Sequence, residues 1–240
     1  MAMALRGKSV SLVMPCRNEG KHLSGLIRKI VSPPSPQDFD EIICVSNCST
    51  DNTLEVGAVL EKEIPCFRML QDDRAIGGIG YGYAHMTGIA AATGEIIVCA
   101  DCDGTYPVED VALIVDIMDK QGLSFVSCCR YPDSGIAPML QLGVKLLNAE
   151  IRLLYGYRIQ DSLSGMWVFK KSVVPDLRLS AGDWNLSPQI KLNAFSVLGK
   201  KAAEVKIHQL KRYGQTKQNY VRTGLGHAWW IAKNRFASSR

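Results

Sequence analysis

The chain has 240 residues, of which 47% are hydrophobic and 21% are charged, and its formal net charge is +5. This length predicts one large α/β domain, with or without a small appendage, and the composition is that of a globular protein with a substantial core. The positive charge is too small and too dispersed for a nucleic-acid-binding protein, but it suits anionic substrates or an anionic membrane surface.

Predicted strands and helices alternate along the chain, which is the pattern of βαβ units around a mostly parallel sheet. The expected strands lie at 9–15, 41–46, 66–70, 96–100, 125–129, 163–170 and 203–210. The expected helices lie at about 23–30, 53–62, 84–92, 107–118, 140–155 and 184–197. The sequence therefore predicts an α/β fold with helices packed on a central sheet.

The last twenty residues, 221–240, form a basic and aromatic tail that we expect to be helical. Trp229 and Trp230 stand beside several Lys and Arg residues. Such a segment packs against the domain, or lies in a membrane interface with its aromatic side chains in the lipid. The sequence leaves both roles open.

The ends of the chain and its cysteines bear on the compartment. The N-terminus lacks the apolar core of a signal peptide, and no run approaches the ~18 uninterrupted apolar residues of a membrane span. Several of the eight cysteines lie within apolar, strand-like runs, which is typical of buried thiols in a reducing compartment. We therefore expect a cytoplasmic protein, and the sequence leaves open a peripheral place at the cytoplasmic face of a membrane.

Two aspartates, Asp101 and Asp103, directly follow the apolar run at 96–100. Ligands of parallel sheets bind at the carboxyl ends of the strands, where this pair is expected. Two neighbouring carboxylates are costly unless a cation lies between them, and their hard oxygen atoms suit Mg²⁺ or Mn²⁺. Such ions commonly bridge to substrate phosphates, so the pair predicts a metal–diphosphate site.

Six motifs follow one another at expected strand ends or in the loops beyond them. In chain order they are Pro15-Cys16-Arg17-Asn18-Glu19, Ser46-Asn47-Cys48-Ser49-Thr50-Asp51, Asp101-Cys102-Asp103-Gly104, Arg130-Tyr131, Asp161-Ser162-Leu163-Ser164-Gly165 and Arg212-Tyr213-Gly214-Gln215-Thr216-Lys217. Together they resemble glycosyltransferase family 2, and within it the dolichyl-phosphate mannosyltransferase-like branch, which glycosylates polyprenyl phosphates. The resemblance covers residues 8–219.

The resemblance implies a GT-A-type fold, a Rossmann-like and mostly parallel sheet with helices on both faces. The domain would span 1–220, with a donor half at about 8–130 and an acceptor half at about 131–220. It implies an inverting displacement without a covalent enzyme intermediate, dependent on Mg²⁺ or Mn²⁺. The donor would be a UDP- or GDP-linked sugar and the acceptor a lipid phosphate or a small molecule; a homodimer is left open.

Roles for single residues follow from the same resemblance. Asp101 and Asp103 would bind the metal. The implied catalytic residues are Asp103, Arg130 and Arg212. The implied nucleotide-sugar-binding residues are Pro15, Arg17, Glu19, Asn47, Arg74, Asp101, Cys102 and Lys217, where the Arg and Lys side chains add positive charge around phosphates.

Two departures from the family pattern keep alternatives open. Asn47 replaces an aspartate, which leaves the base of the donor undecided. Gln189 stands where relatives commonly carry Glu, and an amide cannot act as a general base. A polyprenyl phosphate is already ionised and needs no base, so it is the favoured acceptor; Asp161 or Asp183 could instead serve a soluble hydroxyl acceptor. A nucleotide-sugar-binding protein without turnover is the remaining alternative.

Overall fold

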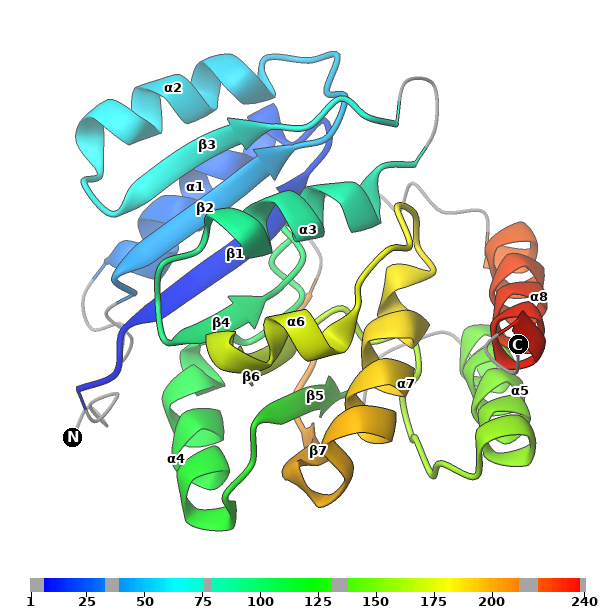
Figure 1. Ribbon diagram of the computed structural model, residues 1–240. Helices are drawn as coiled ribbons and strands as arrows, with labels where there is room; N and C mark the ends of the chain where they lie inside the picture. The colour runs from blue at the N-terminus through cyan, green and yellow to red at the C-terminus, as the bar shows by residue number, and fades with distance from the viewer. Residues whose placement is uncertain (1–6, 33–38, 76–78, 131–137, 212–219, 238–240) are drawn as a thin grey trace.

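The computed structural model describes residues 7–32, 39–75, 79–130, 138–211 and 220–237. Within these residues, seven strands form one sheet in the order β3-β2-β1-β4-β6-β5-β7 (Figure 1). The strands are β1 (Val10–Cys16), β2 (Glu41–Ser46), β3 (Phe67–Gln71), β4 (Ile96–Cys99), β5 (Phe125–Cys129), β6 (Trp167–Lys170) and β7 (Ala202–Lys206). All neighbouring pairs are parallel except those that β6 makes with β4 and β5.

Helices cover both faces of this sheet. The α-helices are α1 (Gly20–Val31), α2 (Thr53–Glu63), α3 (Tyr81–Ala91), α4 (Val111–Gln121), α5 (Pro138–Tyr155), α6 (Val174–Leu177), α7 (Leu186–Leu198) and α8 (Tyr220–Ala237). Short 3₁₀ turns η1 (Val108–Asp110), η2 (Lys171–Val173) and η3 (Gly199–Lys201) adjoin α4, α6 and β7. The predicted α/β class and the helices on both faces are confirmed.

Alternate residues of the strands pack into two separate cores, one on each face of the sheet. On β1, Leu12 and Met14 pack with apolar side chains of α1, α2 and α4, whereas Val13 points to the other face and packs with α3, α6 and α7. This follows from the two-residue period of a strand. Central strands buried on both faces account for the continuous apolar runs in the sequence.

Two predicted strands are shorter than expected by three residues or more. The run predicted at 163–170 is a strand only from Trp167, because residues 161–166 form a loop whose backbone bonds to side chains instead of a ladder; the Gly165 N–H, for example, donates to the Tyr106 hydroxyl at 2.6 Å. The last strand ends at Lys206 rather than at 210.

The tail is helical as predicted, and α8 packs against α5 beside the sheet (Figure 1). Leu147 and Ile151 of α5 meet Ile231 of α8 and Leu192 of α7 in a small third core. Among the described residues, no helix is both long enough and apolar enough to cross a bilayer.

Candidate active site

The carboxyl ends of β1, β2 and β4 meet at one edge of the sheet, as the sequence predicts. β1 pairs in parallel with both of its neighbours, and the ladders continue into the loops. The Asn47 N–H donates to the Cys16 carbonyl at 2.8 Å, and the Ala100 N–H donates to the Val13 carbonyl at 3.1 Å. The first three motifs therefore lie together at this edge.

The loops after β1 and β2 are fastened to each other by side-chain hydrogen bonds. The Thr53 hydroxyl accepts from the Glu19 N–H at 2.9 Å, and the Asp51 carboxylate accepts from the Gly20 N–H at 3.1 Å. A Cβ on Gly20 would lie 2.1 Å from the Asn52 Oδ1 atom, so only glycine permits this approach. Glu19 thus has a fixed backbone at the start of α1, as a ligand-contacting position requires.

Asn47 is buried at the end of β2, and its Oδ1 atom has no hydrogen-bond partner among the described residues. The amide faces Gly80 at the start of α3, where an added Cβ would lie 2.2 Å from Oδ1. A buried acceptor without a partner costs about 1–3 kcal/mol. A donor group of a ligand or a water molecule at Oδ1 would remove that cost, which fits the predicted nucleoside contact.

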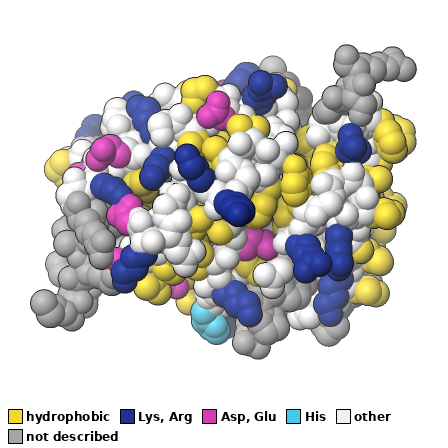
Figure 2. All heavy atoms as spheres, turned by 60° about the horizontal axis from the view of Figure 1, so that its bottom comes forward, with side chains coloured by type: hydrophobic (Ala, Val, Ile, Leu, Met, Phe, Trp, Pro, Cys, Tyr) yellow, Lys and Arg dark blue, Asp and Glu magenta, His cyan; other side chains and the backbone are white. Residues whose placement is uncertain are grey.

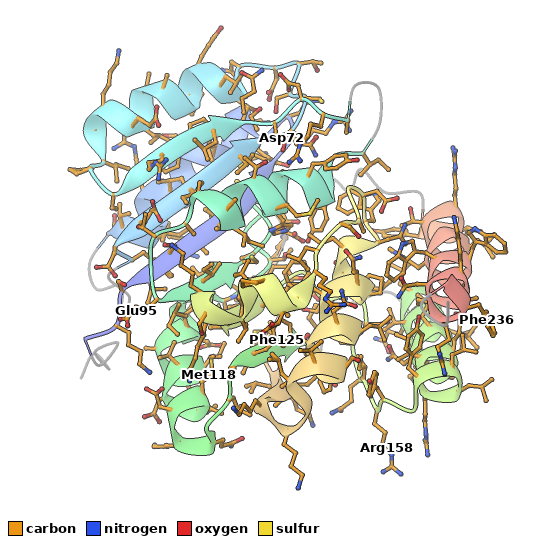
Figure 3. The ribbon with its side chains drawn as sticks, viewed as in Figure 1. Asp72, Glu95, Met118, Phe125, Arg158 and Phe236 are labelled. Carbon is orange, nitrogen blue, oxygen red and sulfur yellow. The ribbon has the colours of Figure 1, made fainter. Side chains whose placement is uncertain are left out.

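Arg74 lies on this side of the sheet, but its guanidinium forms an ion pair with Asp72. Two of its nitrogens bond both carboxylate oxygens, at 3.0 Å and 2.5 Å, and Asp72 lies just beyond β3, beside α3 (Figure 3). The Arg74 hydrogen bonds lower the pKa of Asp72 to about 2 against the opposing effect of burial. Arg74 also donates to Thr87 at 2.8 Å and stacks on the Tyr83 ring. Arg74 therefore fastens the end of β3 to α3. Its guanidinium could bind a phosphate only while it also donates to Asp72 and Thr87.

The two candidate metal ligands are both oriented by hydrogen bonds through their Oδ1 atoms. The Tyr81 hydroxyl of α3 donates to Asp101 at 3.0 Å. The Thr105 N–H and hydroxyl donate to Asp103 at 3.0 Å and 2.6 Å, across a turn in which Gly104 has a φ of 73°. Bonds of this kind set the direction of ligating carboxylates.

The backbone at Gly165 packs closely against Asp101 and Tyr81, an approach that only a residue without a Cβ permits. A Cβ at this position would lie 2.6 Å from the Tyr81 hydroxyl and 3.0 Å and 3.4 Å from the two carboxylate oxygens of Asp101. Two carboxylates held in fixed directions offer the hard oxygen ligands that Mg²⁺ or Mn²⁺ prefers. Asp101 and Asp103 can therefore hold the predicted divalent cation.

The side chain of Cys102, between the two aspartates, points into the core. Its sulfur lies within 4.8 Å of the Cys16 and Cys44 sulfurs, and all three residues are buried. Soft thiols of this kind do not complement a hard cation. Any contact of Cys102 with the nucleotide sugar, as the sequence predicts, would therefore come from its backbone.

Arg130 and Asp161 form a buried ion pair behind the aspartates. Arg130 donates through Nε and Nη2 to both oxygens of Asp161, at 2.8 Å and 2.9 Å, and through its backbone N–H at 3.0 Å. Burial alone would raise the pKa of Asp161, but the charge and hydrogen bonds of Arg130 hold it below the usual value. Asp161 is thus a fully buried, paired carboxylate and does not suit the role of a general base.

Lys191 of α7, which no sequence motif singles out, completes this network. Its ammonium donates to the carbonyls of Asp161 and Ser164 at 2.7 Å and 2.8 Å. Burial lowers the pKa of Lys191 to about 8, against the raising effect of the Asp161 and Glu204 carboxylates. Lys191 and Tyr81 carry no motif signal, because both belong to helices with a largely apolar pattern.

Gln189 has a structural role at the start of α7. Its Oε1 atom accepts from the backbone N–H groups of Ser180 and Ala181 at 2.9 Å and 2.8 Å, and its Nε2 atom donates to the Ser180 hydroxyl at 2.8 Å. The amide therefore holds the preceding loop, and Gly82 of α3 packs on the same loop, since a Cβ there would lie 1.9 Å from the Ala181 carbonyl.

The remaining site predictions are partly outside the described residues. Arg212 and Lys217 lie in the segment 212–219, which the structure does not describe. Pro15 is the half-buried penultimate residue of β1, paired with Val45, and Arg17 directly follows that strand. Asp183 is exposed and accepts two hydrogen bonds from Asn185.

The sequence profile described as glycosyl transferase family 2 matches residues 11–178. The chain belongs to glycosyl transferase family 2. This membership confirms the resemblance drawn from the six motifs, and the protein is a glycosyltransferase.

Relatives of this glycosyltransferase act on sugars, and two of them are named for a lipid phosphate. The dolichyl-phosphate hexose transferase of Haloferax volcanii is 26% identical over 179 residues, which cover 74% of this chain and 73% of the relative. The UDP-N-acetylglucosamine–dolichyl-phosphate N-acetylglucosaminyltransferase of Methanococcus voltae is 26% identical over 183 residues, 70% of this chain and 71% of the relative. The hexosyltransferase Agl6 of Haloferax volcanii is 24% identical over 208 residues; the match covers 82% of this chain but only 46% of Agl6, so the chain spans about half of that relative.

A solved structure of similar fold is glucosyl-3-phosphoglycerate synthase from Mycobacterium tuberculosis, in complex with Mn²⁺, UDP and glucosyl-3-phosphoglycerate. The TM-score is 0.73 at 20% identity, over 96% of this glycosyltransferase and 80% of the neighbour. The likeness confirms the GT-A-type fold. The divalent cation expected from the sequence agrees with the Mn²⁺ that this neighbour binds.

Proposed function

We propose that this glycosyltransferase binds a nucleoside-diphosphate sugar through a divalent cation and transfers the sugar, with inversion, to a polyprenyl phosphate at a membrane surface. The observation that carries the donor half is the pair Asp101 and Asp103, each oriented by a hydrogen bond, from Tyr81 and Thr105 respectively. The cation would neutralise the diphosphate leaving group. The protein's own part is to hold the two carboxylates in place at the end of β4.

The proposal of a polyprenyl phosphate acceptor rests on two positions at which a general base is lacking. Gln189 is an amide whose hydrogen bonds are used in the protein, and Asp161 is buried and paired with Arg130. A phosphate oxygen is already anionic at neutral pH and can attack without losing a proton, whereas a hydroxyl needs a base. The two relatives named for dolichyl phosphate point the same way.

A soluble hydroxyl acceptor is the second candidate, and one observation favours it. Asp183 is an exposed carboxylate three residues before the start of α7, so it could reach a proton that Asp161 cannot.

The test is a transfer assay with Mn²⁺, UDP- and GDP-linked sugars and two acceptors, a short-chain polyprenyl phosphate and a soluble phosphorylated hydroxy acid. The proposal expects nucleoside diphosphate release that depends on the polyprenyl phosphate and on the metal. Asp103→Asn should reduce this rate by about a hundredfold or more, since a metal ligand is lost. Asp176→Asn, which changes an exposed aspartate of α6, is the matched control and should leave the rate unchanged.

Transfer to the soluble acceptor alone, with loss of that transfer in Asp183→Asn, would refute the lipid-phosphate proposal in favour of the second candidate. Sugar-nucleotide binding without release for any donor and acceptor would refute both proposed acceptors.

A further inference from the structure

The helices α5 and α8 form a rigid pair at one side of the molecule. The Tyr155 hydroxyl donates to the Ile231 carbonyl at 2.8 Å, and Arg235 donates through Nε to the Leu154 carbonyl at 2.8 Å. Ile151 and Ile231 are fully buried between the two helices. The geometry of the outer face of this pair is therefore fixed before any partner binds.

The outer face of α8 carries a stripe of apolar side chains. Val221, Leu225, Trp229 and Phe236 are between 67% and 72% exposed, and Phe236 lies on the outer side of the helix (Figure 3). Spacings of four, four and seven residues place these four side chains on one face of a helix. Buried Ile231 marks the opposite face, so α8 is apolar on two sides.

The outer face of α5 carries a matching stripe. Leu142, Leu146 and Leu153 are 58%, 63% and 84% exposed, again at spacings of four and seven. Figure 2 shows hydrophobic side chains along the right-hand edge of the molecule, where α5 and α8 lie in Figure 1, with Lys and Arg side chains beside them. Single exposed apolar residues are ordinary, but aligned stripes on two paired helices indicate an interaction surface.

The charges around the two stripes have one sign. The exposed charged residues of the pair are Lys145, Arg152, Arg222, Lys233 and Arg235. α8 contains no acidic residue, and the acid of α5, Glu150, is partly buried. An apolar stripe flanked by Lys and Arg complements a bilayer surface with anionic headgroups, where the apolar side chains enter the acyl boundary.

We propose that the outer face of the α5–α8 pair, defined by the two apolar stripes and the flanking basic residues, binds the surface of a membrane that contains anionic lipids. A second copy of the chain is the weaker partner for this face. A two-fold interface would place the face against itself and bring the basic groups together, and lysine is depleted in protein interfaces. The inference deepens the proposed function, since a polyprenyl phosphate acceptor resides in such a membrane.

The test is flotation of the full chain with vesicles of phosphatidylcholine alone or of an equal mixture of phosphatidylcholine and phosphatidylglycerol. Binding is expected to the mixed vesicles, to weaken with added salt, and to be at least tenfold weaker with neutral vesicles. The double variant Leu225→Ser with Trp229→Ser should reduce the partition coefficient by about tenfold or more, because both side chains leave the lipid. Lys233→Ala should reduce it by about fivefold on mixed vesicles only.

Matched controls are Leu113→Ser on α4 and Val197→Ser on α7, whose side chains are 52% and 53% exposed but lie off the α5–α8 pair. They should bind vesicles as the wild type does. Circular dichroism and urea unfolding of each variant exclude misfolding, which is not expected since the changed side chains are largely solvent-exposed.

The membrane inference and the proposed function can fail separately. Transfer to a water-soluble short-chain polyprenyl phosphate, measured without vesicles, should be equal in the wild type and the Leu225→Ser, Trp229→Ser variant. If the wild type does not float with mixed vesicles but performs this transfer, the membrane inference is overturned and the proposed function stands. A wild-type dimer in solution that the double variant dissociates, without vesicle binding by either, would assign the face to a second copy and likewise overturn the inference.

Discussion

The close approach of Gly165 to Asp101 and Tyr81 provides the sharpest test of the metal site, through the substitution Gly165→Ala. The new Cβ would lie 2.6 Å from the Tyr81 hydroxyl, whereas ordinary contact begins at 3.4 Å. Tyr81 must therefore retreat by about 0.8 Å, which along its bond to Asp101 would stretch the 3.0 Å distance beyond hydrogen-bonding range. Because Tyr81 is packed against Trp184 and His85, with ring centroids 4.5 Å and 4.6 Å away, this retreat meets resistance.

The expected result is a 10–100-fold loss of Mn²⁺ affinity, the usual cost of removing a group that orients a metal ligand. Crowding should also lower the free energy of unfolding by about 1–3 kcal/mol. Calorimetric titration with Mn²⁺ in the presence of UDP measures the first, and urea unfolding measures the second. Tyr81→Phe, which removes the hydroxyl without adding an atom at Gly165, should lower the affinity without the crowding.

The matched control is Gly25→Ala in α1, where a Cβ meets nothing within 4 Å. That change should stabilise the helix by up to about 1 kcal/mol and leave Mn²⁺ affinity unchanged. Wild-type Mn²⁺ affinity in Gly165→Ala would refute the reasoning, since the packing of this glycine against Tyr81 and Asp101 would then have no part in metal binding.

Three further outcomes follow from the buried polar groups. Asp161→Asn leaves the Arg130 charge without its partner and should lower the free energy of unfolding by about 3–5 kcal/mol, whereas Glu63→Gln, which breaks an exposed pair, should cost under about 1 kcal/mol in urea titrations. Burial lowers the pKa of His227 to about 4, so the unfolded chain binds a proton at this side chain before the folded chain does as the pH falls below about 6.5. The free energy of unfolding should therefore drop by about 2 kcal/mol from this group between pH 7 and 5, and its pH dependence should be flatter in His227→Gln. Gln189→Leu removes the acceptor of the Ser180 and Ala181 N–H groups and should cost about 1–3 kcal/mol, whereas Gln189→Glu keeps both acceptor bonds and should cost under about 1 kcal/mol; equal losses would contradict the assigned bonds.

Much of the fold could be predicted from periodicity. The runs at 41–46 and 125–129 became strands with the predicted bounds, because apolar β-branched residues between turn signals have few alternatives. The direction of β6 could not be predicted. Trp167, Val168 and Phe169 are all buried, and a strand that is apolar on both faces contains no information about its direction in the sheet.

The candidate site could likewise be predicted only in part from the sequence. Asp101, Asp103 and Asn47 were found because each follows a recognisable strand. The residues that orient these side chains could not be predicted, since Tyr81, for example, donates to Asp101 from a helix twenty positions earlier in the chain. Arg130 was expected to meet phosphates, but its pairing with Asp161 depends on folding across thirty-one positions, and spacing alone does not reveal such contacts.

Because β6 runs opposite to its neighbours, the loop before it, and not the loop after it, reaches the edge of the sheet that carries Asp101 and Asp103. β4 and β5 both end at that edge, whereas β6 begins there. The segment before this strand, with Asp161 and Gly165, is thereby delivered beside the aspartates, and the turn after it, Lys171–Val173, emerges at the far rim. Insertions after Lys170 should therefore leave the transfer activity intact. A single residue added between Asp161 and Trp167 should displace both Asp161 and Gly165 from their places beside the aspartates.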